Sequence, residues 1–459
     1  MSVFQNNRNP EEYNCLQAFI NGNVITKLSL LVFGLGNFCS RQIIRGMIFL
    51  SIEIGYLVYM IVFGINALAD FVTLGTEAQG ERYNEVLGIY EYTMGDNSML
   101  CLLYGVLTIV LTTAVIIMGC VSCRNAFATQ YRKENGMRIP AFREDLHSMK
   151  EKNLHTLLLA APLGGIIIFT IIPLLFMILI AFTSFDRNHQ PPGNLFEWVG
   201  VKNFSSVFGM GGNLAATFWP VLGWTLVWAV FATFTTYILG LMLALLINRK
   251  GTGGKGFWRF LFVLSVAVPQ FVTLLSMRTI FNTNGPVNVL LRELGLIDMT
   301  EAVPFFTDPV TARITVILIN IWIGVPYTML STTGILQNIP KELYEAARMD
   351  GAGNVTVFRR ITLPYMLFVM TPNLITAFTG NINNFNVIYL LTGGGPESMD
   401  YYYAGKTDLL VTWLYKLTIV QKDYNLGAVI GIMTFVTLAI VSLVTYRSTD
   451  SYKDEGAFQ

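Results

Sequence analysis

The sequence predicts an all-α protein that crosses a membrane about eight times. Of the 459 residues, 53% are hydrophobic and only 13% are charged, whereas a typical soluble domain carries about 25% charged residues. The mean hydropathy of the chain is +0.53. The apolar residues also gather in runs of about twenty, the length that an α-helix needs to cross the hydrocarbon core of a bilayer. Together these observations indicate a polytopic membrane protein.

Eight apolar runs are long enough to be spans. They cover approximately residues 46–66, 99–119, 156–183, 219–247, 260–281, 312–335, 365–391 and 426–447. The stretch 28–38 is too short to cross the bilayer, and we interpret it as an interfacial or half-inserted segment. The polar N-terminus, residues 1–14, has no cleavable signal, so we expect the first span to be retained.

The distribution of positive charge predicts the orientation of these spans, because lysine and arginine concentrate on the cytoplasmic side. With the N-terminus inside, 21 of the 30 lysines and arginines fall in cytoplasmic segments. The outer segment 67–98 carries six carboxylates and one arginine. We therefore expect a multi-pass plasma-membrane protein with both termini in the cytoplasm.

Three regions follow from this topology. Residues 1–155 form an N-terminal hairpin of two spans and a basic cytoplasmic linker. Residues 156–447 form a core of six spans, which includes a polar cytoplasmic insert at 336–364. Residues 448–459 form a polar cytoplasmic tail.

The polar insert contains residues at fixed offsets. They are Glu345-Ala346-Ala347, then Gly351 after three residues, Ile361 after nine more, and Leu363-Pro364 after one more. This pattern resembles the EAA loop of ABC import permeases, a short cytoplasmic helix that sits in a cleft of a partner ATPase. The resemblance implies that ATP is bound by another polypeptide. The alternative is an ordinary amphipathic loop helix.

The residue types of the insert suit contact with a partner. Small residues at 346, 347 and 351 let a helix approach another chain closely. Glu345 and Arg348 offer charge. Leu363 and Pro364 are expected to end the insert before the next apolar run.

Two predicted spans carry polar residues, which are costly in a bilayer and therefore often functional. In the seventh run, Ala377, Gly380, Asn381 and Asn384 share one helical face by spacing. In the sixth run, the corresponding residues are Asn320, Ile323, Gly324 and Tyr327. Amides bind hydroxyl groups and a tyrosine ring stacks on a sugar face, so these strips suit a neutral polyol. Hydrogen bonding and small-residue packing between helices explain them equally well.

The remaining chemistry-bearing residues indicate neither an enzyme nor a cofactor site. The near-zero net charge of +1 argues against a nucleic-acid partner. The glycine-rich turn 251–256 lacks the spacing of a nucleotide-binding loop. Cys120 and Cys123 have metal-like spacing but no second pair, so we expect them to pack rather than to bind metal.

Several further segments resemble the maltose/maltodextrin permease subunits of the MalF type, over about residues 156–447. The segments that carry this resemblance are 199–204, 306–309, 311–313, 320–327, 383–385, 390–392, 394–396, 404–405 and 407–411. The resemblance implies a type I ABC importer permease fold with a sugar site halfway across the membrane, formed by the two polar strips. Two positions depart from the family: Ala377 and Gly380 stand where its best-known members carry serine and phenylalanine.

The resemblance also implies partners. These are a second, MalG-like permease, a dimer of cytoplasmic ABC ATPases, an extracellular solute-binding lipoprotein, an oligosaccharide and membrane lipid. The outer segment 184–218 has about 35 residues, too few for the domain that Gram-negative relatives fold there. We therefore expect a bacterium without a periplasm.

The sequence thus predicts the permease subunit of an ATP-driven importer for malto-oligosaccharides or a related glucan. A permease for another oligosaccharide, such as a raffinose-type or multiple-sugar substrate, is the alternative. An ion-coupled secondary transporter is a less favoured one, because it needs an ionisable residue within the spans.

Overall fold

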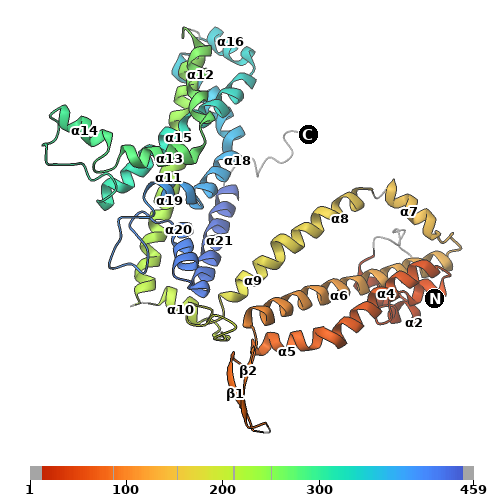
Figure 1. Ribbon diagram of the computed structural model, residues 1–459. Coiled ribbons are helices and arrows are strands. Elements are labelled where there is room, and N and C mark those ends of the chain that lie inside the picture. The colour runs from red at the N-terminus through yellow and green to blue at the C-terminus, as the bar shows by residue number, and fades with distance from the viewer. Residues whose placement is uncertain (1–12, 86, 152–153, 210–211, 250, 448–459) are drawn as a thin grey trace. The chain divides into compact units, whose positions relative to one another are not determined.

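The computed structural model describes residues 13–85, 87–151, 154–209, 212–249 and 251–447, and these divide into two units, Met1–Val199 and Gly200–Gln459 (Figure 1). The predicted tail at 448–459 lies outside the described residues. The predicted domain boundary between residues 155 and 156 remains a prediction.

The first unit is mainly helical. Its helices are α1 Cys15–Asn21, α2 Val24–Leu28, α3 Leu35–Cys39, α4 Ile43–Tyr59, α5 Ile65–Thr73, α6 Ser98–Glu134, α7 Phe142–Lys150, α8 Leu154–Ile166 and α9 Ile172–Ile180. π-Helical segments at Met60–Gly64 and Ile167–Ile171 join α4 to α5 and α8 to α9. Two strands, β1 Gly80–Asn84 and β2 Ile89–Thr93, form an antiparallel hairpin that was not predicted.

The second unit contains the remaining helices. They are α10 Lys202–Phe208, α11 Asn213–Asn248, α12 Lys255–Ala267, α13 Gln270–Ile280, α14 Pro286–Glu293, α15 Pro309–Asn338, α16 Lys341–Met349, α17 Asn354–Val357, α18 Leu363–Ile382, α19 Phe385–Leu391, α20 Leu410–Tyr415 and α21 Tyr424–Arg447. π-Helical segments at Phe358–Thr362 and Lys416–Val420 follow α17 and α20.

Within the described residues, seven helical stretches are long and apolar enough to cross a membrane, and a bent pair makes an eighth if it is counted as one span. Each of the eight predicted runs overlaps one of these stretches, so the predicted all-α polytopic class is confirmed. Some helices extend well past the predicted ends. Helix α6 has 37 residues, about 55 Å at 1.5 Å per residue, and so exceeds the roughly 30 Å hydrocarbon core.

The predicted fifth span is not one helix. Helices α12 and α13 meet at an angle of 88°. The break falls at Val268 and Pro269, where Val268 is extended (φ −79°, ψ 127°). Proline disfavours the helical conformation of the residue before it and lacks the N–H that would continue the helix.

The predicted seventh span, 365–391, is also interrupted. Helix α18 ends at Ile382, and α19 begins at Phe385. The side chain of Asn384 accepts a hydrogen bond from the N–H of Val387 at 3.2 Å and so caps α19. The seventh span therefore begins and ends earlier than predicted, at Asn354 and Ile382, and Asn384 is not on the helical face that carries Ala377 and Gly380.

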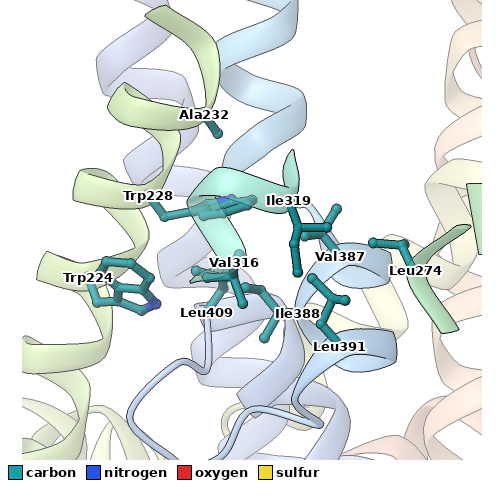
Figure 2. Close-up of a cluster of buried hydrophobic side chains, with 10 residues drawn as sticks. All are labelled: Trp224, Trp228, Ala232, Leu274, Val316, Ile319, Val387, Ile388, Leu391 and Leu409. Carbon is teal, nitrogen blue, oxygen red and sulfur yellow. The ribbon is translucent and has the colours of Figure 1, made fainter. Parts of the chain in front are cut away.

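A buried hydrophobic cluster of the second unit joins five parts of the chain (Figure 2). Its residues are Trp224, Trp228 and Ala232 of α11, Leu274 of α13, Val316 and Ile319 of α15, Val387, Ile388 and Leu391 of α19, and Leu409 before α20. Trp224 and Trp228 bring large aromatic rings to this cluster, and their packing holds α11 against α15 and α19. This packing sets the positions of the polar residues on α15 and at the end of α18.

Candidate functional site

The insert at 336–364 contains α16, whose C-terminal end explains Gly351. The N–H of Gly351 donates to the carbonyl of Arg348 at 3.0 Å, and the N–H of Ala352 donates to that of Ala347 at 2.9 Å. Gly351 has φ +77°. This is the Schellman arrangement, in which a residue with positive φ ends the helix, and glycine adopts it without steric cost. Gly351 is therefore required by the backbone as well as by its small size.

Leu363 and Pro364 do not end the insert, contrary to the sequence prediction. The stretch from Asn354 to Ile382 is one helical run, in which the π-helical segment Phe358–Thr362 leads directly into α18. Pro364 directly follows the π-helical segment, inside this continuous run, so the change in hydrogen-bond pattern at the π-helical segment accommodates it. The chain break that separates α16 from this run lies instead at Gly351.

Helix α16 is largely solvent-exposed. Glu345, Ala346 and Arg348 are exposed, and Ala347 is half-buried. The hydroxyl groups of Tyr344 and Thr362 lie 3.1 Å apart and link α16 to the run that enters the membrane. The structure thus presents the predicted partner-facing residues on a free surface of this chain, with a direct link to α18 through Tyr344.

The polar residues predicted on the sixth span lie on α15, which packs closely along α11. Asn320 is 8% exposed, and within the described part of the chain its side chain has no hydrogen-bond partner. Ile323 packs against the Trp224–Trp228 cluster. Gly324 approaches α11 so closely that an added Cβ would lie 2.5 Å from Cγ2 of Thr236.

Asn381, at the end of α18, is held by α11 through two hydrogen bonds. Its Nδ2 donates to Oγ1 of Thr233 at 2.9 Å, and its carbonyl accepts from Nε1 of Trp228 at 3.0 Å. Its Oδ1 accepts from Nδ2 of Asn384 at 3.3 Å. The structure therefore brings Asn381 and Asn384 together, although through a helix end rather than along one helical face.

Three of the predicted sugar-site residues lie on the surface of this chain. The side chain of Tyr327 is 66% exposed, and Ala377 and Gly380 are exposed as well. An added Cβ at Gly380 would meet no atom within 4 Å. These three positions are open to a ligand or to another subunit, whereas Ile323, Gly324 and Asn381 are occupied in packing within the chain.

Sequence reasoning missed the residues of α11 that meet the polar strips. They are Trp228, Thr233 and Thr236. The sequence contains part of the information needed to find them, because Thr233 and Thr236 are polar residues three positions apart in an apolar run. Their partners could not be inferred, because the pairing of α11 with α15 and α18 is long-range.

The segments that carry the maltose-type resemblance near the C-terminus build one loop. Asp408 is buried, and its Oδ2 accepts from Nζ of Lys416 at 2.6 Å and from the N–H of Gly405 at 2.7 Å. The hydroxyl groups of Thr392 and Thr407 lie 2.8 Å apart. These bonds fix the loop between α19 and α20, which explains why the sequence signals occur at both of its ends.

Known proteins resemble the chain along most of its length. The family described as "binding-protein-dependent transport system inner membrane component" matches residues 236–451. The galactooligosaccharides transport system permease protein GanP of Bacillus subtilis is 36% identical and covers 94% of this chain and 99% of the relative. The maltodextrin transport system permease protein MdxF of the same organism is 34% identical and covers 93% and 95%.

Similarity to the Gram-negative proteins is shorter. The maltose/maltodextrin permease protein MalF of Escherichia coli is 37% identical, over 54% of this chain and 49% of the relative. Among solved structures, a bacterial ABC transporter for import of the acidic polysaccharide alginate has a chain with a TM-score of 0.52 and 21% identity, covering 66% of this chain and 97% of that one. This structural likeness supports the fold.

These matches define a class of membrane-embedded transport permeases. This chain belongs to the family of binding-protein-dependent transport system inner membrane components, and the predicted resemblance to MalF-type permeases is confirmed. It is therefore a multi-pass permease and not an enzyme.

Proposed function

We propose that this chain is a transmembrane subunit of an ATP-driven importer for malto-oligosaccharides or a related glucan. The observation that carries this proposal is the similarity over 93% of the chain to a maltodextrin transport system permease protein. In this proposal the chain performs no chemistry. It provides part of a sugar site near the membrane midplane and transmits the movement of a separate ATPase.

The geometry of the polar residues supports the sugar site. Asn320 is 8% exposed, and within the described residues its side-chain amide has no hydrogen-bond partner, so its donors and its acceptor are available to a ligand. A sugar hydroxyl would pair with this amide. Tyr327, Ala377 and Gly380 are open on the surface of the chain, where a ligand or a second permease would cover them.

The insert supports coupling to an ATPase. Helix α16 exposes Glu345, Ala346 and Arg348, and Tyr344 connects it to Thr362 at the entrance of the membrane-spanning run. A partner that moves α16 would therefore also displace α18. We propose a dimer of cytoplasmic ATPases as that partner, with a MalG-like second permease and an extracellular solute-binding lipoprotein completing the importer.

The proposed location follows from charge. Cytoplasmic placement of both termini puts the insert inside, together with most lysines and arginines. The 184–218 segment is short, and the similarity to MalF of Escherichia coli covers only half of that protein. Both observations favour the plasma membrane of a bacterium without a periplasm, where the binding protein is anchored by lipid.

A second candidate substrate is a galactooligosaccharide. GanP of Bacillus subtilis is 36% identical over almost the whole of both chains. Galacto- and malto-oligosaccharides both present many hydroxyl groups and apolar ring faces, so amides and Tyr327 suit either.

Uptake by cells distinguishes the two candidates. Cells that lack the gene and cells that carry it are given labelled maltotriose or labelled galactotriose, each with the other sugar as an unlabelled competitor. We expect gene-dependent, ATP-dependent uptake of maltotriose. Gene-dependent uptake of galactotriose alone would make the galactooligosaccharide the substrate, and uptake of neither would contradict an importer for these sugars.

A further inference from the structure

The hairpin of β1 and β2 forms an arm on the outer segment 67–98. Figure 1 shows the two strands extending beyond the ends of α5 and α6. Glu81 pairs with Tyr92, and Tyr83 pairs with Tyr90. Because paired residues of an antiparallel ladder point to the same side, these four side chains share one face.

This face, which we call the tyrosine face (Glu81, Tyr83, Tyr90 and Tyr92), is open. Tyr83, Tyr90 and Tyr92 are 52%, 70% and 62% exposed. The rings of Tyr83 and Tyr90 lie 5.1 Å apart. Isolated two-stranded hairpins are at best marginally stable in water, so three exposed tyrosines on one face indicate a surface that another molecule covers.

The base of the arm is fixed. Oδ2 of Asp96 accepts from the N–H of Thr76 at 2.7 Å and of Glu77 at 3.0 Å, and the N–H of Asp96 donates to the carbonyl of Glu77 at 2.7 Å. The N–H groups of Glu77 and Thr76 hold the pKa of Asp96 below its usual range. Asp96 therefore stays ionised at neutral pH and keeps the arm in place, which lowers the entropy lost when a partner binds.

The charge of the arm selects its partner. The segment from Asp70 to Asp96 carries six carboxylates and one arginine, and that Arg82 is paired with Glu77 at 2.9 Å. Such a surface attracts a basic partner and repels an acidic one. Tyrosine is enriched at the centres of protein interfaces, because it buries a large rigid ring and keeps a polar tip.

We infer that the tyrosine face is a docking surface for a basic region of the extracellular solute-binding protein. This inference rests on the proposed function. The family is named for its dependence on such proteins, and one solved neighbour is described in complex with a pentasaccharide-bound periplasmic protein.

Two other occupants fit less well. A sugar platform favours rings that lie in one plane, but Tyr83 and Tyr90 are inclined at 58°. A bilayer surface that contains anionic lipid repels the carboxylates of the arm. A protein with a basic face can pack against the inclined rings and is attracted by the carboxylates of the arm.

The test uses the complete transporter in nanodiscs and the solute-binding protein encoded beside its gene, produced without its lipid anchor. The variant is Tyr90→Thr with Tyr92→Thr, which keeps strand-forming residues in the ladder. The matched control is Ile89→Thr, which makes a comparable change on the opposite face, where the side chain is 53% exposed. Affinity is measured by surface plasmon resonance, and ATP hydrolysis is measured against binding-protein concentration.

We expect the tyrosine variant to weaken binding about tenfold or more, and maximal hydrolysis at saturating binding protein to remain unchanged. Ile89→Thr should bind as the wild type does. Glu81→Lys should weaken binding and reduce its dependence on salt. Unchanged affinity in the tyrosine variant, or an equal loss in Ile89→Thr, would overturn the inference.

Two added measurements identify the other occupants. Lower retention of the tyrosine variant on immobilised maltodextrin, without binding protein, would assign the face to sugar. Weaker association of the complete transporter in nanodiscs with phosphatidylglycerol vesicles after the same changes would assign it to lipid. Either result contradicts the inference if the tyrosine variant still binds the solute-binding protein with wild-type affinity. If the proposed function were wrong, the result would differ from the sugar and lipid outcomes. In that case the wild-type transporter itself would show no ATP hydrolysis stimulated by binding protein and sugar.

Discussion

At the scale of single residues, the predicted site residues divide into those that pack within the chain and those that stay open on its surface. Gly324 allows α15 to approach α11, and Asn381 ties the end of α18 to the same helix. Tyr327 and Gly380, by contrast, make few contacts within the chain. Spacing along the sequence predicted a sugar contact for all four residues. Only their surroundings in the folded chain show which of them pack and which are open.

Substitution of Gly324 should destabilise the protein. In Gly324→Ala the added Cβ would lie 2.5 Å from Cγ2 of Thr236, and such overpacking costs about 1–3 kcal/mol. The expected result is a lower midpoint of thermal unfolding for the purified transporter. Thr236→Ser removes the clashing methyl group and should restore much of the loss.

Gly380→Ala is the control for this prediction. An added Cβ there meets no atom within 4 Å, and alanine favours a helix by about 1 kcal/mol relative to glycine. The control should unfold at the wild-type temperature or above it. Equal destabilisation by both changes would mean that the approach of α15 to α11 does not determine the cost.

The role of Asn381 can be separated from its packing. Asn381→Leu removes the amide, whereas Thr233→Val removes only the acceptor of its hydrogen bond to α11. If Asn381 binds sugar, its loss should slow uptake by the equivalent of about 1 kcal/mol or more, while Thr233→Val transports at nearly the wild-type rate. The measurement is initial uptake of labelled maltotriose at matched expression.

Asn384 needs a different substitution, because its side chain caps α19. Asn384→Asp keeps the capping oxygen and loses the amide N–H groups, whereas Asn384→Leu loses both. Normal uptake by Asn381→Leu and Asn384→Leu together would identify the asparagines as packing residues and contradict a sugar contact.

At the scale of elements, the insert is a helix of its own that ends in a glycine turn. Sequence spacing identified Glu345, Ala346, Ala347 and Gly351 as residues of the insert motif. The structure explains the glycine at position 351, because the backbone there has a positive φ. The placement of Leu363 and Pro364 at a chain break was wrong, because the helical run from Asn354 to Ile382 continues through both residues, with a π-helical segment directly before them. A proline can therefore lie inside a helical run at a point where the hydrogen-bond pattern changes.

The insert is expected to transmit force and not to bind sugar. Glu345→Lys reverses an exposed charge on α16, and Gly351→Pro cannot adopt φ +77°. Both variants should lose ATP hydrolysis that is stimulated by sugar and binding protein in the reconstituted transporter, while sugar binding to the external protein is unchanged.

A surface substitution on the same helix provides the comparison. Lys341→Gln, at the start of α16, should retain most of the stimulated hydrolysis. Wild-type stimulation in both Glu345→Lys and Gly351→Pro would show that another segment couples this chain to the ATPase.

At the scale of the whole molecule, the proposed function predicts that this chain and the external binding protein both contribute to selectivity. Gly380 stands where an aromatic residue occurs in the best-known relatives, and it leaves open space at the end of α18. Glycine removes a stacking surface and frees volume, which suits a long ligand with many weak contacts. Tyr327 then remains as the principal stacking residue.

Gly380→Phe should therefore shift the preference of the transporter from long malto-oligosaccharides towards maltose. The measurement is competitive uptake of a series of chain lengths by cells that carry either form, with the same binding protein. Because a Cβ at this position meets no atom within 4 Å, the change should not disturb folding of the chain. An unchanged length profile at matched expression would place selectivity in the binding protein.

The sequence alone determined the features that depend on local composition and spacing. Apolar runs identified each span because a helix in a bilayer must satisfy its own backbone hydrogen bonds and cover about 30 Å. The fixed offsets of the insert identified the family for a similar reason, since they lie within a few turns of one segment. Positive charge predicted the orientation without reference to any contact.

Only the tertiary structure decided how those segments meet. The hydrogen bond from Asn381 to Thr233 and the contact of Gly324 with Thr236 depend on pairs of residues far apart in the chain. The tyrosine face was likewise invisible, because its residues come together only when β1 pairs with β2. Periodicity along a chain shows which side of an element is distinctive, but packing decides what that side touches.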